Sequence, residues 1–165
     1  MLSDPTENTS NPLDHVEEIL NGNNWAYNRM TDDELMVQIT GKSCDYRLIF
    51  VWQENMTALQ FCCQYDLCLN RKNIPAAAIA LLEVNSALWM GHFEITRDTF
   101  VPSFRHTSLL RGHSEQSGFE SIHDLVDIAL AQCERYRHVF EILGMENIAD
   151  TQTLSLAIME TQGES

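Results

Sequence analysis

Residues 59–69 have the sequence Leu-Gln-Phe-Cys-Cys-Gln-Tyr-Asp-Leu-Cys-Leu, and this stretch decides the fold. Every second side chain is apolar or aromatic, from Leu59 through Phe61 and Tyr65 to Leu69, while Gln60, Gln64 and Asp66 occupy alternate positions. Successive side chains of a strand point to opposite faces of a sheet, so the alternation predicts a strand with one buried and one wetter face.

Period-2 patterns of the same kind surround this strand, and helical patterns flank the group. We expect a helix capped by Asn11 and ended by a left-handed Gly22, a loop over 112–118, and a long helix that Gly144 ends. The expected order is helix 12–22, strands 25–30, 35–40, 44–53 and 59–69, helix 73–90, strands 91–97 and 101–111, and helix 119–143. Strands joined by short turns pair antiparallel.

The predicted fold class is therefore α+β, a single antiparallel sheet of about five to six strands with helices packed on one face. We expect residues 1–10 to form a disordered N-terminal tail and 11–143 to form the domain. Residues 144–165 are a C-terminal extension, compatible with a short helix over 151–160 through Leu154, Ile158 and Met159.

Composition restricts the classes of partner. The 165 residues carry 24 acidic side chains against 10 Lys and Arg, a net charge of −14, which disfavours nucleic acid and anionic membranes as partners and suits basic or neutral polypeptides. The chain has no apolar stretch of membrane-spanning length and its first residues are polar, so we expect a cytosolic protein. Its five cysteines are then expected to be reduced.

Motifs for catalysis or metal binding are weak. The sequence lacks the nucleophile-elbow, phosphate-loop, dinucleotide and zinc-protease motifs, so we expect no enzyme and no cofactor. Cys62 and Cys63 should point to opposite faces, with Cys63 in the core, and cannot form a disulfide within a strand. His106 is predicted to face inward and His92 outward. His123 and Asp127, four apart on a helix, have metal-ligand spacing, but on a solvated face.

The tryptophans Trp25, Trp52 and Trp89 are assigned to the core. The wetter face of the sheet carries more apolar side chains than a solvent-exposed face needs. The wetter face carries Met36, Ile49, Val51 and Cys62, with Leu109 as a further candidate, among glutamines. A face this apolar is often covered, by residues 151–160, by a second copy of the chain or by another protein. These four residues are our candidates for partner binding.

Several segments together resemble one family. Asn-Pro-Leu at 11–13, Cys-Asp-Tyr-Arg at 44–47, Val-Asn-Ser-Ala-Leu-Trp-Met-Gly-His-Phe at 84–93, Phe-Arg-His at 104–106, Leu-Leu-Arg-Gly at 109–112 and Cys-Glu-Arg at 133–135 are similar to the YbjN-domain family of bacteria. The resemblance covers about 11–143 and implies a sensory-transduction regulator. It also implies a fold like that of type III secretion chaperones, which are small, acidic, mostly dimeric proteins that bind polypeptides. It supplies no catalytic residues.

Two functions remain open at this point. The first is a non-catalytic cytosolic protein-binding module, regulator or chaperone-like, that forms a homodimer and contacts another protein or polypeptide segment. The alternative is a sensor domain that binds a small molecule or a metal through His106 or through His123 and Asp127.

Overall fold

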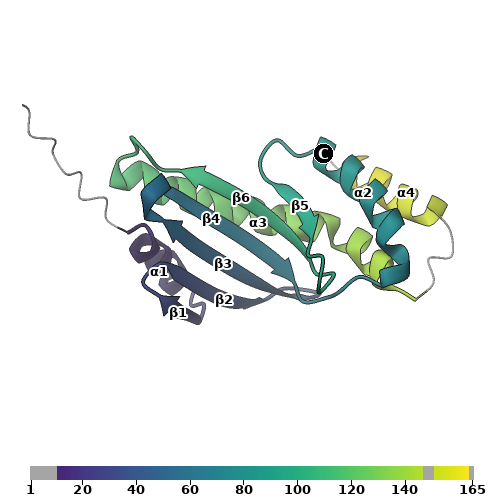
Figure 1. Ribbon diagram of the computed structural model, residues 1–165, viewed down its shortest axis with the longest axis horizontal. Helices are drawn as coiled ribbons and strands as arrows, with labels where there is room; N and C mark the ends of the chain where they lie inside the picture. Colours follow the sequence, from purple (N-terminus) through teal and green to yellow (C-terminus); the bar gives the residue numbers. More distant parts are fainter. Residues whose placement is uncertain (1–10, 147–150, 164–165) are drawn as a thin grey trace, which may run out of the picture.

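The computed structural model describes residues 11–146 and 151–163 (Figure 1); the tail predicted for 1–10 lies outside the described residues. Within these residues, four α-helices and six strands follow one another. They are α1 Leu13–Gly22, β1 Tyr27–Thr31, β2 Glu34–Thr40, β3 Asp45–Gln53, β4 Ala58–Tyr65, α2 Ile74–Ser86, β5 His92–Ile95, β6 Pro102–Leu109, α3 Glu115–Gly144 and α4 Thr151–Gly163.

The six strands form one open antiparallel sheet in the order β1-β2-β3-β4-β6-β5. The α+β prediction is confirmed. In Figure 1 the long helix α3 runs behind the sheet, whereas α2 and α4 lie together beyond β5. The sheet therefore has an inner face covered by α3 and α1 and an outer face turned away from them.

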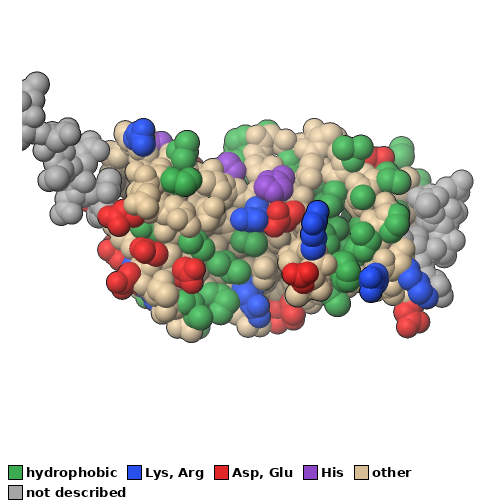
Figure 2. All heavy atoms as spheres, viewed as in Figure 1, with side chains coloured by type: hydrophobic (Ala, Val, Ile, Leu, Met, Phe, Trp, Pro, Cys, Tyr) green, Lys and Arg blue, Asp and Glu red, His purple; other side chains and the backbone are tan. Residues whose placement is uncertain are grey.

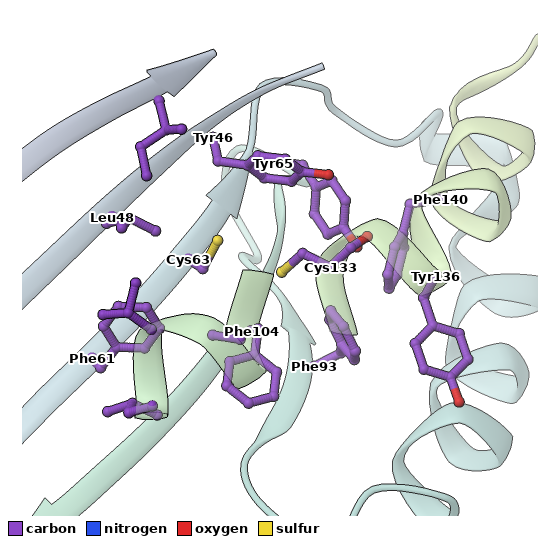
Figure 3. Close-up of a cluster of buried hydrophobic side chains, with 14 of the residues drawn as sticks. Tyr46, Leu48, Phe61, Cys63, Tyr65, Phe93, Phe104, Cys133, Tyr136 and Phe140 are labelled. Atoms are coloured by element: carbon purple, nitrogen blue, oxygen red, sulfur yellow. The ribbon is translucent and has the colours of Figure 1, made fainter. Parts of the chain in front are cut away.

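The core lies between the inner face and α3. One cross-strand row runs from Val37 through Leu48, Cys63 and Phe104 to Phe93, and each of these side chains is at most 1% exposed. Rings and thiols from the sheet meet α3 in Figure 3, where Phe140 and Tyr136 pack against Phe93. Burial of this area is the main stabilising contribution to the fold.

The strand predicted over 59–69 is correct in its alternation but ends at Tyr65. β3 begins at Asp45, so β4 has no partner beyond that point, and the Asp66 amide makes its last bond to the Asp45 carbonyl at 3.0 Å. The chain then leaves the sheet, and Leu69 donates to the Phe100 carbonyl at 2.8 Å. Leu67 and Leu69 are therefore loop residues, of which Leu69 is buried.

The first helix begins as expected, because Asn11 Oδ1 accepts the Leu13 amide at 3.0 Å. Its end differs from the prediction. The left-handed residue is Asn24, with φ of 56°, and Gly22 is the last helical residue. Arg29 of β1 donates to Asp14 at 2.9 Å and Glu17 at 3.0 Å, which ties the edge strand to this helix.

The loop predicted over 112–118 is wrong in its second half, because α3 begins at Glu115. Ser114 is the reason: its Oγ accepts the Ser117 amide at 3.1 Å, a side-chain cap that offsets the low helix propensity of Gly118. Gly144 ends the helix as predicted. The Tyr65 hydroxyl donates to the Cys133 carbonyl and joins β4 to the middle of α3.

The helix predicted over 73–90 is shorter, because α2 ends at Ser86. Asn85 holds it to β5: the side-chain amide donates to the Phe93 carbonyl at 3.0 Å, and its oxygen accepts the Phe93 amide at 2.7 Å. The short C-terminal helix exists as α4, extending to Gly163. Arg135 of α3 donates two bonds, at 2.9 and 3.1 Å, to the Thr161 carbonyl.

Candidate partner-binding surface

The four candidate residues all lie on the outer face of the sheet. Strand register places Met36, Ile49 and Cys62 in one cross-strand row, and Val51 in the next row beside Gln60. Each of the four side chains is partly exposed. The sequence pattern therefore predicted their side of the sheet correctly, because period-2 alternation fixes which residues share a face. We call these four residues the outer-face row.

The possibility that residues 151–160 cover this face is wrong. In α4, Leu154, Ala157 and Ile158 are buried, and the helix packs against α2 and α3 rather than on the outer face. Within the described residues the outer-face row thus has no helix above it. Polar groups surround it, including Gln38, Gln60 and Arg47 in neighbouring positions of the sheet.

A second apolar surface, which sequence reasoning missed, lies on the two helices beyond β5. Ile79 is 65% exposed, Leu82 75%, Leu156 56% and Met159 65%. We call these four residues the helical patch; Figure 2 shows green hydrophobic side chains gathered over this end of the molecule. The available signal was the sequence of α2, which is apolar on all sides and therefore needs burial on all sides.

Of the three tryptophans assigned to the core, only Trp52 is fully buried there. Trp52 is 5% exposed, whereas Trp25 is half-buried at the margin of the core. Trp89 is 76% exposed, so its assignment to the core is wrong. It follows the end of α2 on the segment leading to β5, where no helical periodicity applies.

The histidine candidates do not gather into a metal site. His92 faces outward and His106 inward, as predicted, and burial together with the nearby His92 lowers the pKa of His106. His123 Nδ1 lies 3.4 Å from Asp127 Oδ2, and both side chains are about half exposed or more, at 49% and 69%. Among residues 11–146 and 151–163, no three metal-ligating side chains lie close enough to share an ion.

The thiols are free and sit in contrasting surroundings. Cys63 of β4 and Cys133 of α3 point toward one another in the core (Figure 3). A hydrogen bond to Cys133 and burial raise the pKa of the Cys63 thiol well above its ordinary value. Cys62 faces the other way, and burial raises the pKa of its thiol as well. A neutral thiol is a poor nucleophile, so neither residue is set up for redox or covalent chemistry.

A shallow pocket of about 300 Å³ lies where β3 begins and β4 ends, on the side of the outer-face row. Its lining includes Gln38, Arg47 and Gln64 of the sheet, with Asp45 and Asp66 at one margin. These groups can form hydrogen bonds to a polar partner but do not pair a nucleophile with a general base. Within the described parts of the chain, no helix combines the length and apolar character needed to cross a membrane.

Comparison with known proteins identifies a family. A family model named YbjN, described as "Putative bacterial sensory transduction regulator", matches residues 12–141. Among solved structures, a crystal structure described as "YbjN, a putative transcription regulator from E. coli" is similar, with a TM-score of 0.52 at 9% identity over 76% of this chain and 92% of that chain. At that identity the similarity concerns the fold alone. No curated protein sequence matches.

Proposed function

Because the chain belongs to the YbjN family, we propose that it is a non-catalytic regulator that acts by binding polypeptides, including a second copy of itself. The family description supports a regulator-like role. The exposure of the helical patch is the observation that supports binding to proteins, since large apolar side chains exposed together at one end of a molecule often mark an interaction site. Two surfaces would then serve two kinds of contact.

The helical patch suits self-association. No charged side chain occurs from Ile74 to Leu82 in α2 or from Thr153 to Met159 in α4. Two copies of a chain with a net charge of −14 repel one another, and they approach best through a surface without charge. Interfaces between permanently associated subunits are also more apolar than transient ones. A twofold arrangement would place the same patch of each copy against its counterpart.

The outer-face row suits a different, transient partner. Met36, Ile49, Val51 and Cys62 provide modest apolar area, and the glutamines around them provide hydrogen-bond donors and acceptors. Transient interfaces are about as apolar as the rest of a protein surface, and polar groups around a small apolar centre fit that description.

One experiment tests both assignments. Light scattering measures the mass of the wild type, of Leu82→Asp, and of Ile49→Asp/Val51→Asp, with Ser86→Asp at the exposed end of α2 as a control. We expect Leu82→Asp to halve the mass and the other variants to keep it. Crosslinking pull-downs from the native cell should lose foreign partners only with Ile49→Asp/Val51→Asp. A wild type that stays monomeric, or pull-downs that do not change, would contradict the proposal.

A further inference from the structure

Part of strand β6 is an open edge. β5 pairs with β6 only from Pro102 to Arg105, so within the described residues the backbone from His106 to Leu109 has a neighbour only on its β4 side. Antiparallel strands direct their backbone groups alternately to one side and the other. The Val101 carbonyl accepts from Thr96 on the β5 side. The odd-numbered residues of β6 therefore face that side, and the N–H and C=O groups of Thr107 and Leu109 face the open edge.

The neighbouring edge is blocked at Phe93. The bonds from Asn85 to the backbone of Phe93 occupy the groups that this residue of β5 directs away from the sheet. Proteins commonly block strand edges, because an exposed edge is a template for another strand. The fold protects β5 at Phe93 in this way, whereas the backbone groups of Thr107 and Leu109 in β6 remain available.

A notch lies at the end of this open edge. A pocket of about 500 Å³ is lined by Gly91, His92, Arg105, His106 and Thr107. Gly91 has a φ of 69°, and a side chain there would collide with the ring of Phe104. Glycine thus lets the chain enter β5 close to β6, where the open part of the edge begins.

The notch has a higher share of basic side chains than the chain as a whole. Arg105 and two histidines line it, and in Figure 2 histidine side chains lie beside an arginine or lysine near the middle of the visible face. The neighbouring acid is Glu94, whose carboxylate lies 3.1 Å from Arg105 Nη1 and 3.6 Å from His92 Nε2. On the outer face one carboxylate, that of Glu94, thus lies beside two basic side chains, Arg105 and His92, in a protein where acids outnumber Lys and Arg by 24 to 10. The notch is therefore suited to an additional anion.

Strand direction specifies which anion arrives there. A segment added antiparallel to β6 runs in the same direction as β5 and in line with it. Its carboxyl end therefore meets the start of β5 at His92. We propose that the β6 edge from His106 to Leu109 binds the C-terminal segment of a partner polypeptide as an added strand, with its terminal carboxylate in the notch. Strand addition and carboxylate capture are both established modes of peptide recognition.

The register also predicts a side-chain preference. If the last residue of the segment pairs with Thr107, the third residue from the end pairs with Leu109 on the outer face. Leu109 is 66% exposed, so an apolar residue at that position of the segment would bury it. This inference rests on the proposed function in that it assumes polypeptide binding, but it uses neither the helical patch nor the outer-face row.

The test uses arrays of pentapeptides displayed with free C-terminal carboxylates and matched arrays with C-terminal amides, probed with the full-length protein. We expect binding to concentrate on the carboxylate array and on peptides with an apolar third-from-last residue. For the best peptide in solution, the amide should bind about tenfold more weakly, as expected for loss of a charged hydrogen bond. Equal signals on the two arrays, or none on either, would overturn the inference.

Two variants locate the site. Arg105→Gln should abolish the preference for carboxylate over amide, while Arg97→Gln, at an exposed position between β5 and β6 and away from the notch, should not. Thr107→Pro removes an amide that faces the open edge and no bond within the sheet, so it should block binding while the protein remains folded by circular dichroism.

Failure of this inference and failure of the proposed function can be told apart by repeating the peptide titration on Leu82→Asp and on Ile49→Asp/Val51→Asp. Peptide binding that persists in both variants, with unchanged mass and partners, would sustain the inference and contradict the proposed surfaces. If instead Leu82→Asp halves the mass and Ile49→Asp/Val51→Asp loses its partners, but the wild type binds no peptide, the proposed surfaces would be sustained and this inference contradicted.

Discussion

A leucine in the body of the molecule, which is the sheet with α1 and α3, is buried, whereas a leucine at the end formed by α2 and α4 is exposed, as Leu48 and Leu82 show. In the body, Leu48 of β3 is completely buried between the sheet and α3. In α2, Leu82 is 75% exposed, although its sequence neighbours are as apolar as those of Leu48. The body has one apolar face per strand and covers it. The helical end has more apolar surface than the described residues bury.

This difference indicates which residues are buried by the fold of the single chain and which would be buried only by another molecule. Inner-face residues contribute to folding stability, whereas residues of the helical patch contribute only when something covers them. The outer-face row lies between the two extremes, being partly exposed and mixed with polar groups.

The largest expected effect comes from a matched pair of leucine substitutions. Leu48→Ala should lower the free energy of unfolding by about 2–5 kcal/mol, because it leaves a cavity in a close-packed core. Leu82→Ala should change it by at most about 0.5 kcal/mol in dilute protein, where the side chain remains in water. Urea unfolding followed by circular dichroism measures both. Similar losses in the two variants would mean that the helical patch is buried within the single chain.

A concentration series sharpens the same comparison. If the helical patch joins two copies, the stability lost in Leu82→Ala grows with protein concentration, because dimer formation stabilises the folded state by mass action. The loss in Leu48→Ala should not acquire this dependence.

The contrast also explains which features the sequence could predict. Strict alternation in β2, β3 and β4 predicted the sheet, its two faces and the positions of Met36, Ile49, Val51 and Cys62 correctly, because a period of two leaves one choice of face. In α2 nearly every residue is apolar, so periodicity could not identify the exposed side of the helix, on which Leu82 lies. Trp89 is assigned to the core by the sequence pattern because the helix is predicted to continue to residue 90, whereas α2 ends at Ser86.

Other misses came from single hydrogen bonds. The Ser114 cap begins α3 four residues before its first predicted apolar residue, Phe119. The open edge of β6 depends on where β5 begins, and β5 begins at His92, in register with Arg105 and directly after Gly91. Where two strands stop pairing depends on two segments together, so the periodicity of either segment alone does not predict it.

A smaller effect is expected at the junction between body and helical end. Asn85→Ala removes both side-chain bonds to Phe93 and leaves its backbone groups unpaired at the β5 edge, which should cost about 1–3 kcal/mol. Hydrogen exchange should show faster exchange of the Phe93 amide, with little change at β2 and β3. Asn21→Ala on the exposed side of α1 is the control. Unchanged exchange at Phe93 would mean that α2 does not protect this edge.

The smallest perturbation distinguishes buried from exposed thiols without changing the sequence. Cys68 is exposed just beyond β4, whereas Cys63 is fully buried and the pKa of its thiol is raised by the Cys133 bond and by burial. A thiol-specific reagent at pH 8 should therefore modify Cys68 rapidly in the native protein and reach Cys63 only on unfolding, since the thiolate is the reactive form. Peptide mass mapping identifies the modified residues, and Cys68→Ser should remove the fast phase. If Cys63 in the native protein reacts as fast as Cys68, α3 separates readily from the sheet. The core between them would then be as accessible to solvent as the helical end, which would contradict the comparison.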